Sequence, residues 1–125
     1  MKARWLQILL LGLLCIGLSG CGGEPAVPID PALVEATVRT EPAPASSGTP
    51  VTLVAEFTGA EITDRADVTL DIRVDGNPVL IDATYDGEGG FEATYTFADS
   101  GSYETFVHLY VDDLHLTKKA QVDVQ

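Results

Sequence analysis

The stretch Phe91-Glu-Ala-Thr-Tyr-Thr-Phe97 leads through a short turn into Asp99-Ser-Gly-Ser-Tyr103-Glu-Thr-Phe-Val-His-Leu109. Both segments alternate apolar and polar residues, which is the period of strands with one buried and one solvated face. The second segment begins with the D-x-G-x-Y form of Asp99, Gly101 and Tyr103. In immunoglobulin-like sandwiches a tyrosine at this place donates its hydroxyl hydrogen to backbone just upstream. The sequence therefore predicts a structural corner at Asp99, Gly101 and Tyr103, with the Tyr103 side chain largely buried.

The same period of two continues outward from this stretch. The further alternating runs are Val34 to Val38, Val51 to Phe57, Val68 to Val74, Ile81 to Tyr85 and Ala120 to Val124. In the second of these runs Thr52, Val54 and Glu56 are expected to face water. Turn residues separate the runs, at Glu41 to Pro50, Asp75 to Pro78, Asp86 to Gly90 and Asp112-Asp113. The pattern predicts an all-β fold, an immunoglobulin-like antiparallel β-sandwich of about seven strands.

The N-terminal segment has a different composition. Lys2 and Arg4 precede an almost entirely apolar run from Leu6 to Leu18. The run ends in Leu18-Ser19-Gly20-Cys21, which resembles the lipobox of bacterial lipoproteins. The resemblance implies cleavage before Cys21 and acylation of its thiol, for example with palmitate. The alternatives are ordinary secretion or a retained helix, although the run is short of the roughly 20 residues that span a bilayer.

These features divide the chain into three parts. Residues 1–20 are predicted to be a lipoprotein signal peptide, residues 21–31 a lipidated cysteine with a flexible tether, and residues 32–125 the folded domain. Loss of Lys2 and Arg4 with the signal changes the formal net charge from −12 to −14. Such a charge disfavours nucleic acid as a partner, because nucleic acid is bound by neutralising its phosphates. The domain has no remaining thiol for a disulfide or for redox catalysis.

The second half of the chain resembles a known family. The segments Asp86-Gly-Glu-Gly-Gly-Phe-Glu-Ala-Thr-Tyr-Thr-Phe97, Ser100-Gly-Ser-Tyr-Glu-Thr-Phe-Val-His-Leu109 and Leu114-His-Leu-Thr-Lys-Lys119 are similar to the YtkA-like/FixH-like family of small membrane-anchored bacterial domains. The resemblance implies an extracytoplasmic immunoglobulin-like fold and no catalytic residue. Met1 is the only methionine and leaves with the signal, so no methionine-rich copper site is implied.

The two histidines are candidate metal ligands. His108 and His115 flank Asp112-Asp113. If those two residues form the turn, Tyr110 lies opposite His115 and His108 is its diagonal neighbour on one face, within about 7 Å. Two imidazoles with a carboxylate are suited to Zn²⁺ or Cu²⁺. A register slip by one residue would separate them, and the alternative is a pair of exposed strand histidines.

Other chemistry has less support in the sequence. Asp86-Gly87-Glu88 and Asp112-Asp113 offer oxygen ligands, but neither matches an EF-hand loop. Ser100 and Ser102 belong to the corner motif, where a structural role suffices. The glycines between Asp86 and Gly90 connect two strands, so they do not form a phosphate loop before a helix.

Together these observations predict a non-catalytic module for binding a protein or another ligand. It would be lipid-anchored on the extracytoplasmic side of the cell membrane, need no cofactor, and meet a protein partner at the cell envelope. The candidate binding residues are Phe106, His108, Tyr110 and His115, unless the loop from Glu41 to Pro50 covers them. The alternative is a copper- or zinc-handling accessory protein for a membrane oxidase, with His108 and His115 as metal ligands.

Overall fold

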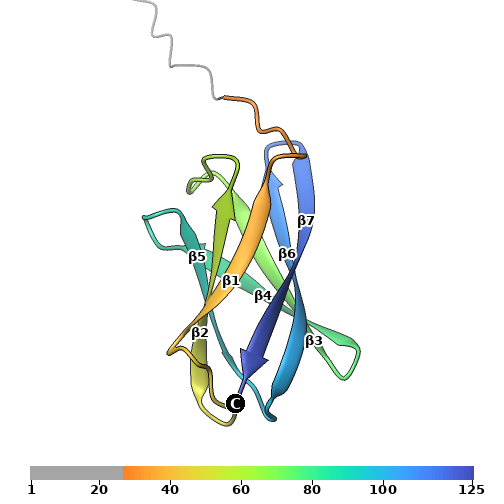
Figure 1. Ribbon diagram of the computed structural model, residues 1–125. Helices are drawn as coiled ribbons and strands as arrows, with labels where there is room; N and C mark the ends of the chain where they lie inside the picture. Colours follow the sequence, from red (N-terminus) through yellow and green to blue (C-terminus); the bar gives the residue numbers. More distant parts are fainter. Residues whose placement is uncertain (1–26) are drawn as a thin grey trace, which may run out of the picture.

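The computed structural model describes residues 27–125, and within them the chain is all-β (Figure 1). The predicted signal peptide and Cys21 lie outside the described residues. The seven strands are β1 (Glu35–Glu41), β2 (Pro50–Thr58), β3 (Asp67–Val74), β4 (Asn77–Tyr85), β5 (Gly90–Thr96), β6 (Gly101–Val111) and β7 (Leu114–Val124). The predicted fold class is confirmed. No helix suited to crossing a membrane occurs between residues 27 and 125.

All neighbouring strands are antiparallel, in the hydrogen-bonded order β1-β2-β5-β4-β3-β6-β7. β4 pairs with β3 along most of its length but with β5 only at Thr84 and Tyr85. The sheet therefore folds over at β4, and the β1-β2-β5 part faces the β3-β6-β7 part (Figure 1). At the outer edges, Ala45 and Val124 form a parallel bridge between the two parts.

Two tight turns set the register of the hairpins. Val74 pairs with Asn77, so Asp75 and Gly76 form a two-residue turn, and their φ angles of 52° and 78° are those of a type I′ turn. The β6–β7 turn consists of Asp112 and Asp113, with Asp112 also at positive φ. Its register is the predicted one, so the outward side chains of β6 lie beside those of β7.

The core lies between the two parts of the sheet. Its largest members are Phe91, Phe97, Leu53, Leu70, Ile72 and Leu109. The prediction for one position of β2 was wrong: Val54, expected to face water, is fully buried. Its cross-strand neighbours are Arg39 on β1 and Glu92 on β5. Hydrogen bonds to Glu56 and Glu41 hold the Arg39 side chain on this face and raise its pKa.

The corner motif lies at the start of β6. The Tyr103 hydroxyl donates to the carbonyl oxygen of Asp99 at 2.6 Å, which is the bond of a tyrosine corner. The Tyr103 ring packs against the buried Phe97 ring at a centroid distance of 4.6 Å. The side chain is half-buried, which is less than the sequence predicts.

Tyr103→Phe is expected to lower the free energy of unfolding by about 1 kcal/mol, because the Asp99 carbonyl loses its donor while ring packing is kept. Urea denaturation monitored by circular dichroism measures the change. Tyr95→Phe is the matched control, since Tyr95 is also half-buried beside Phe97 but its hydroxyl has no protein partner among residues 27–125. Equal effects of the two substitutions would contradict a stabilising corner.

Candidate binding surface around Asp71 and His108

The predicted binding residues of β6 share one face. Thr105, Val107 and Leu109 point into the core, and Phe106, His108 and Tyr110 alternate with them on the opposite side. We call the outward side of β3, β4, β6 and β7 the outer face. It carries Leu80 of β4, which is 64% exposed, and Tyr110, which is 40% exposed.

The loop from Glu41 to Pro50 does not cover these residues. The Ser47 amide donates to the Gln125 carbonyl oxygen at 2.8 Å, and Ala45 bridges to Val124. Val124 pairs with Gly101 at the start of β6, whereas Tyr110 is near its end. The loop therefore lies at the other end of the strands, and the alternative of a covering loop is wrong.

An almost fully buried carboxylate lies at the centre of the outer face. Asp71 of β3 is 4% exposed, and its cross-strand neighbours are Leu80 on one side and Phe106 on the other. Its Oδ2 atom accepts a hydrogen bond from Arg73 Nη2 at 2.8 Å. His108 Nε2 lies 3.5 Å from the same oxygen. Asp71 therefore contacts both the guanidinium group of Arg73 and the imidazole ring of His108.

Arg73 completes this cluster by covering an aromatic ring. Its guanidinium carbon lies 5.1 Å from the centroid of the Phe106 ring, a cation–π contact. Two buried polar atoms of the cluster, Asp71 Oδ1 and Arg73 Nε, have no hydrogen-bond partner within residues 27–125. An unpaired buried acceptor and donor cost stability, so the cluster is not optimised for stability alone.

The two histidines lie side by side on this face, as the sequence predicts from the two-residue turn. His108 Nδ1 is 3.4 Å from His115 Nε2 and 3.0 Å from Thr117 Oγ1. The Tyr110 ring stacks on the His115 ring, with centroids 4.2 Å apart. The Nε2 atom of His108 faces Asp71 and its Nδ1 atom faces Thr117, so the tautomer of the ring sets the direction of the hydrogen bond to Thr117.

The separation of the two histidine nitrogens matches that of two ligands in a metal site. Zn–N bonds of about 2.0–2.1 Å in a tetrahedral site place two ligand nitrogens about 3.3 Å apart, close to the observed 3.4 Å. Asp71 faces the opposite nitrogen of His108, so it would orient the ligand rather than bind the metal. No group of three His, Cys, Asp or Glu side chains suited to a metal ion occurs in the part of the chain that the structure describes.

Asp71 and Arg73 are the members of this surface that sequence reasoning missed. Both occupy polar positions of the alternating run Val68 to Val74, so they read as ordinary solvated residues. Their importance comes from the pairing of β3 with β6, which places Phe106 opposite Asp71. The sequence signal that could have identified them is that Asp71 and Arg73 are two residues apart, which places an acid and a base side by side on one face of a strand.

No protein-family model matches the chain, and no curated protein matches its sequence. Among solved structures it is similar to an engineered protein that was crystallised as a target of the Northeast Structural Genomics Consortium. The TM-score is 0.54 and the identity 19%, over 77% of this chain and 21% of that protein. The chain thus spans about a fifth of the matched protein's length. This likeness shows the fold alone.

Proposed function

We propose that this protein is a lipid-anchored, extracytoplasmic β-sandwich that binds a protein partner through its outer face and catalyses no reaction. The lipobox-like Leu18-Ser19-Gly20-Cys21 supports the anchor. The resemblance of the second half of the chain to the YtkA-like/FixH-like family supports a non-catalytic envelope domain.

The observation that carries the binding role is the composition of the outer face. Arg, Tyr and other aromatic side chains are the residues that dominate binding energy in protein interfaces. Here Phe106, Arg73 and His108 surround a carboxylate that is already desolvated, and Tyr110 stacks on His115 beside this cluster. A partner that covers Leu80 and Tyr110 would bury apolar area without having to desolvate Asp71. The net charge of the chain favours a partner with a basic surface.

Tyr110→Ala is expected to weaken partner binding about tenfold or more, the effect of losing an aromatic hot spot. Its stability should change by less than about 1 kcal/mol, because the side chain is 40% exposed. A photo-crosslinking residue at Leu80 measures binding in the anchored protein, and the adduct should be lost with Tyr110→Ala. The control places the same photo-crosslinking residue at Thr94, which is exposed on the outward side of β5. Equal adducts from both positions would contradict the proposal.

Cys21→Ala tests the anchor. The substitution removes the thiol that carries the acyl chains, so the protein should leave the membrane fraction or remain unprocessed. Fractionation and the mass of the chain report the two outcomes. Membrane partitioning and mass that match the unaltered protein, apart from the substitution, would contradict lipidation.

Metal handling is the second candidate, and the 3.4 Å separation of the His108 and His115 nitrogens favours it. The pair would need further ligands from a partner or from water, as an accessory protein that passes copper or zinc to a membrane oxidase would allow. Titration with Zn²⁺ or Cu²⁺ tests this by NMR shifts of the two imidazoles. Absence of any shift at millimolar metal would remove this candidate and leave protein binding in place.

A further inference from the structure

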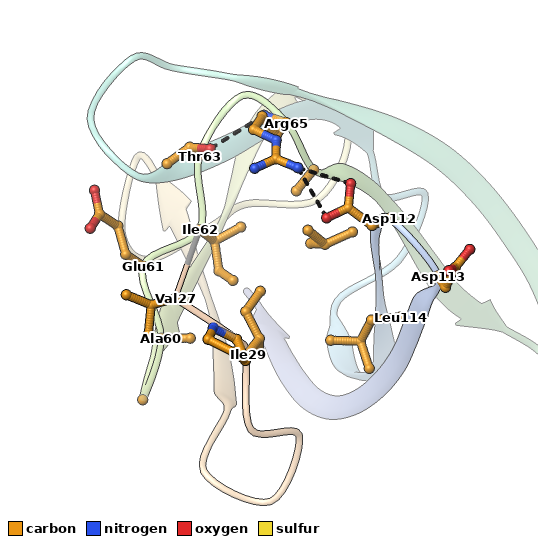
Figure 2. Close-up of a pocket in the computed structure, with 14 residues that line it drawn as sticks. Val27, Ile29, Ala60, Glu61, Ile62, Thr63, Arg65, Asp112, Asp113 and Leu114 are labelled. Carbon is orange, nitrogen blue, oxygen red and sulfur yellow. Dashed lines mark hydrogen bonds and ion pairs between the residues drawn. The ribbon is translucent and has the colours of Figure 1, made fainter. Parts of the chain in front are cut away.

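An open cavity of about 810 Å³ lies at the end of the sandwich where the chain leads into β1 (Figure 2). Three segments form its wall: residues 27–29, the β2–β3 loop at 59–66, and the β6–β7 turn at 111–114. Ile62 and Leu114 lie on either side of the space in Figure 2. The volume is within the range of cavities that enclose small ligands, and the wall is mostly apolar, so the cavity is suited to an apolar occupant.

The charged side chains of the wall favour an uncharged occupant. Arg65 forms two hydrogen bonds to the Asp112 carboxylate, at 2.9 and 3.0 Å, so the two charges compensate each other. Glu61 and Asp113 lie on opposite sides of the cavity, and their carboxylates point away from it (Figure 2). Among the described residues of the wall, none therefore directs an unpaired charge into the space. The two exposed carboxylates would repel an anion, whereas a hydrocarbon chain needs no opposite charge to bind.

The cavity lies beside the part of the chain that leads back to Cys21. Val27 of its wall is six residues after Cys21, and six residues reach at most about 21 Å. An acyl chain attached to Cys21 adds about 15 Å, because it spans half of the hydrocarbon core of a bilayer. An acyl group on Cys21 can therefore reach into the cavity without any change in residues 27–125.

We infer that the cavity holds one acyl chain of the lipid on Cys21. The inference rests on the lipid anchor of the proposed function and gives that lipid a second place to bind. Linkage to the same chain makes the binding intramolecular, so the acyl chain meets the cavity at an effective concentration on the order of millimolar. An acyl chain joined to Cys21 is uncharged, as the wall requires. A phospholipid or a fatty acid would instead bring a phosphate or a carboxylate to the acidic side chains.

The bilayer and the cavity are comparable surroundings for an acyl chain. A methylene that leaves water is stabilised in either of them, because both are apolar. A cysteine that carries several acyl chains can place one in the cavity and keep others in the bilayer, where two are enough for stable anchoring. The bound chain would hold this end of the sandwich at the bilayer, where the exposed side chains of Val27 and Leu33 also lie. It would leave the outer face free for a partner.

Intramolecular photo-crosslinking tests the inference with the full lipidated protein. Cells incorporate a fatty acid with a terminal diazirine into the lipid of Cys21, and the purified protein is placed in vesicles of unlabelled phospholipid. After illumination, mass spectrometry is expected to find the acyl group of the Cys21 peptide joined to residues 59–66 or 111–114. Links from the acyl group to vesicle lipid alone would overturn the inference.

Substitutions in the cavity wall make the test specific. Ala60→Trp should lower the yield of these internal links about tenfold, because the half-buried Ala60 lines the cavity and an indole would fill it. Ile29→Glu, in the segment before β1, should have a similar effect by placing a carboxylate in the apolar wall. Circular dichroism checks that each variant is folded. Ala98→Trp, exposed at the other end of the sandwich, is the matched control and should leave the yield unchanged. Equal yields for all three variants would overturn the inference.

Membrane phospholipid is the competing occupant. The unaltered protein with an unlabelled anchor is therefore illuminated in vesicles that contain diazirine-labelled phospholipid. Phospholipid adducts in residues 59–66 and 111–114 with a yield equal to that of the internal links would overturn the inference. The mass of the chain separates the two proposals. An acylated protein without internal links retains the anchor of the proposed function, whereas a chain without an acyl group on Cys21 removes both the anchor and the inference.

Discussion

Arg73→Ala is expected to lower the free energy of unfolding by about 3 kcal/mol. The side chain of Asp71 is 6% exposed, and Arg73 supplies its 2.8 Å ion pair. The Arg73 side chain is itself 39% exposed, but its removal leaves the buried carboxylate without its main compensating charge, which costs more than the pair contributes. His108 is 3.5 Å away and remains as a weaker partner. Urea denaturation at neutral pH measures the loss.

Lys119→Ala is the matched control for Arg73→Ala. Lys119 pairs with Glu104 at 2.7 Å on the same outer face, but both side chains are largely exposed. Exposed pairs contribute between 0 and about 1 kcal/mol, because water solvates each partner that is left alone. Similar losses for the two substitutions would mean that Asp71 is solvated when Arg73 is absent.

The Asp71–Arg73 pair also bears on why the outer face has this composition. Apolar residues of similar volume are often as stabilising as a buried ion pair, and Asp71 Oδ1 and Arg73 Nε stay without partners in the described residues. Stability alone therefore does not account for the pair. Its visible effect is positional: Asp71 lies against the His108 ring, and Arg73 lies over the Phe106 ring. Under the proposed function, the pair would hold the binding surface in one conformation, which would explain both contacts.

The sequence predicted the features that depend on local patterns. Alternation of period two identified the strands, because a half-buried strand must change its face at each residue. Asp112-Asp113 fixed the β6–β7 register, and with it the proximity of His108 and His115. The D-x-G-x-Y motif located the hydrogen bond from Tyr103 to Asp99. Each of these is determined by residues close together in the chain.

The features that escaped prediction depend on contacts between distant segments. The burial of Asp71 requires β3 to lie between β4 and β6, so that Leu80 and Phe106 flank it. Val54 is buried on the outward side of β2, where alternation predicts an exposed residue. An open cavity lies at the end of the sandwich where the chain leads into β1 (Figure 2). It is lined by residues 27–29, 59–66 and 111–114, which no sequence pattern connects. The burial of Asp71, the burial of Val54 and the cavity all depend on which strands are neighbours in the sheet, so the strand order must be known before they can be identified.

Phe97→Ala is expected to cost about 4 kcal/mol of stability, the range for aromatic truncation in a core. Phe97 is fully buried, with the rings of Tyr95 and Tyr103 at centroid distances of 4.8 and 4.6 Å. The Gly48 amide also donates to the Phe97 carbonyl oxygen at 2.7 Å, so the β1–β2 loop is hydrogen-bonded to the segment that carries the ring. The cavity left by the ring would therefore loosen both the corner and the loop.

Phe106→Ala separates this core effect from an effect on binding. Phe106 is half-buried on the outer face, and its ring contacts Arg73 rather than the core. Its loss should cost less than about 2 kcal/mol, because less apolar area returns to water, while adduct formation from Leu80 should fall as it does for Tyr110→Ala. Thermal unfolding of the two alanine variants, taken before any binding assay, makes the comparison. If Phe106→Ala were as destabilising as Phe97→Ala, the ring would be a structural support of the sheet, and Tyr110 would be left as the aromatic candidate of the outer face for partner recognition.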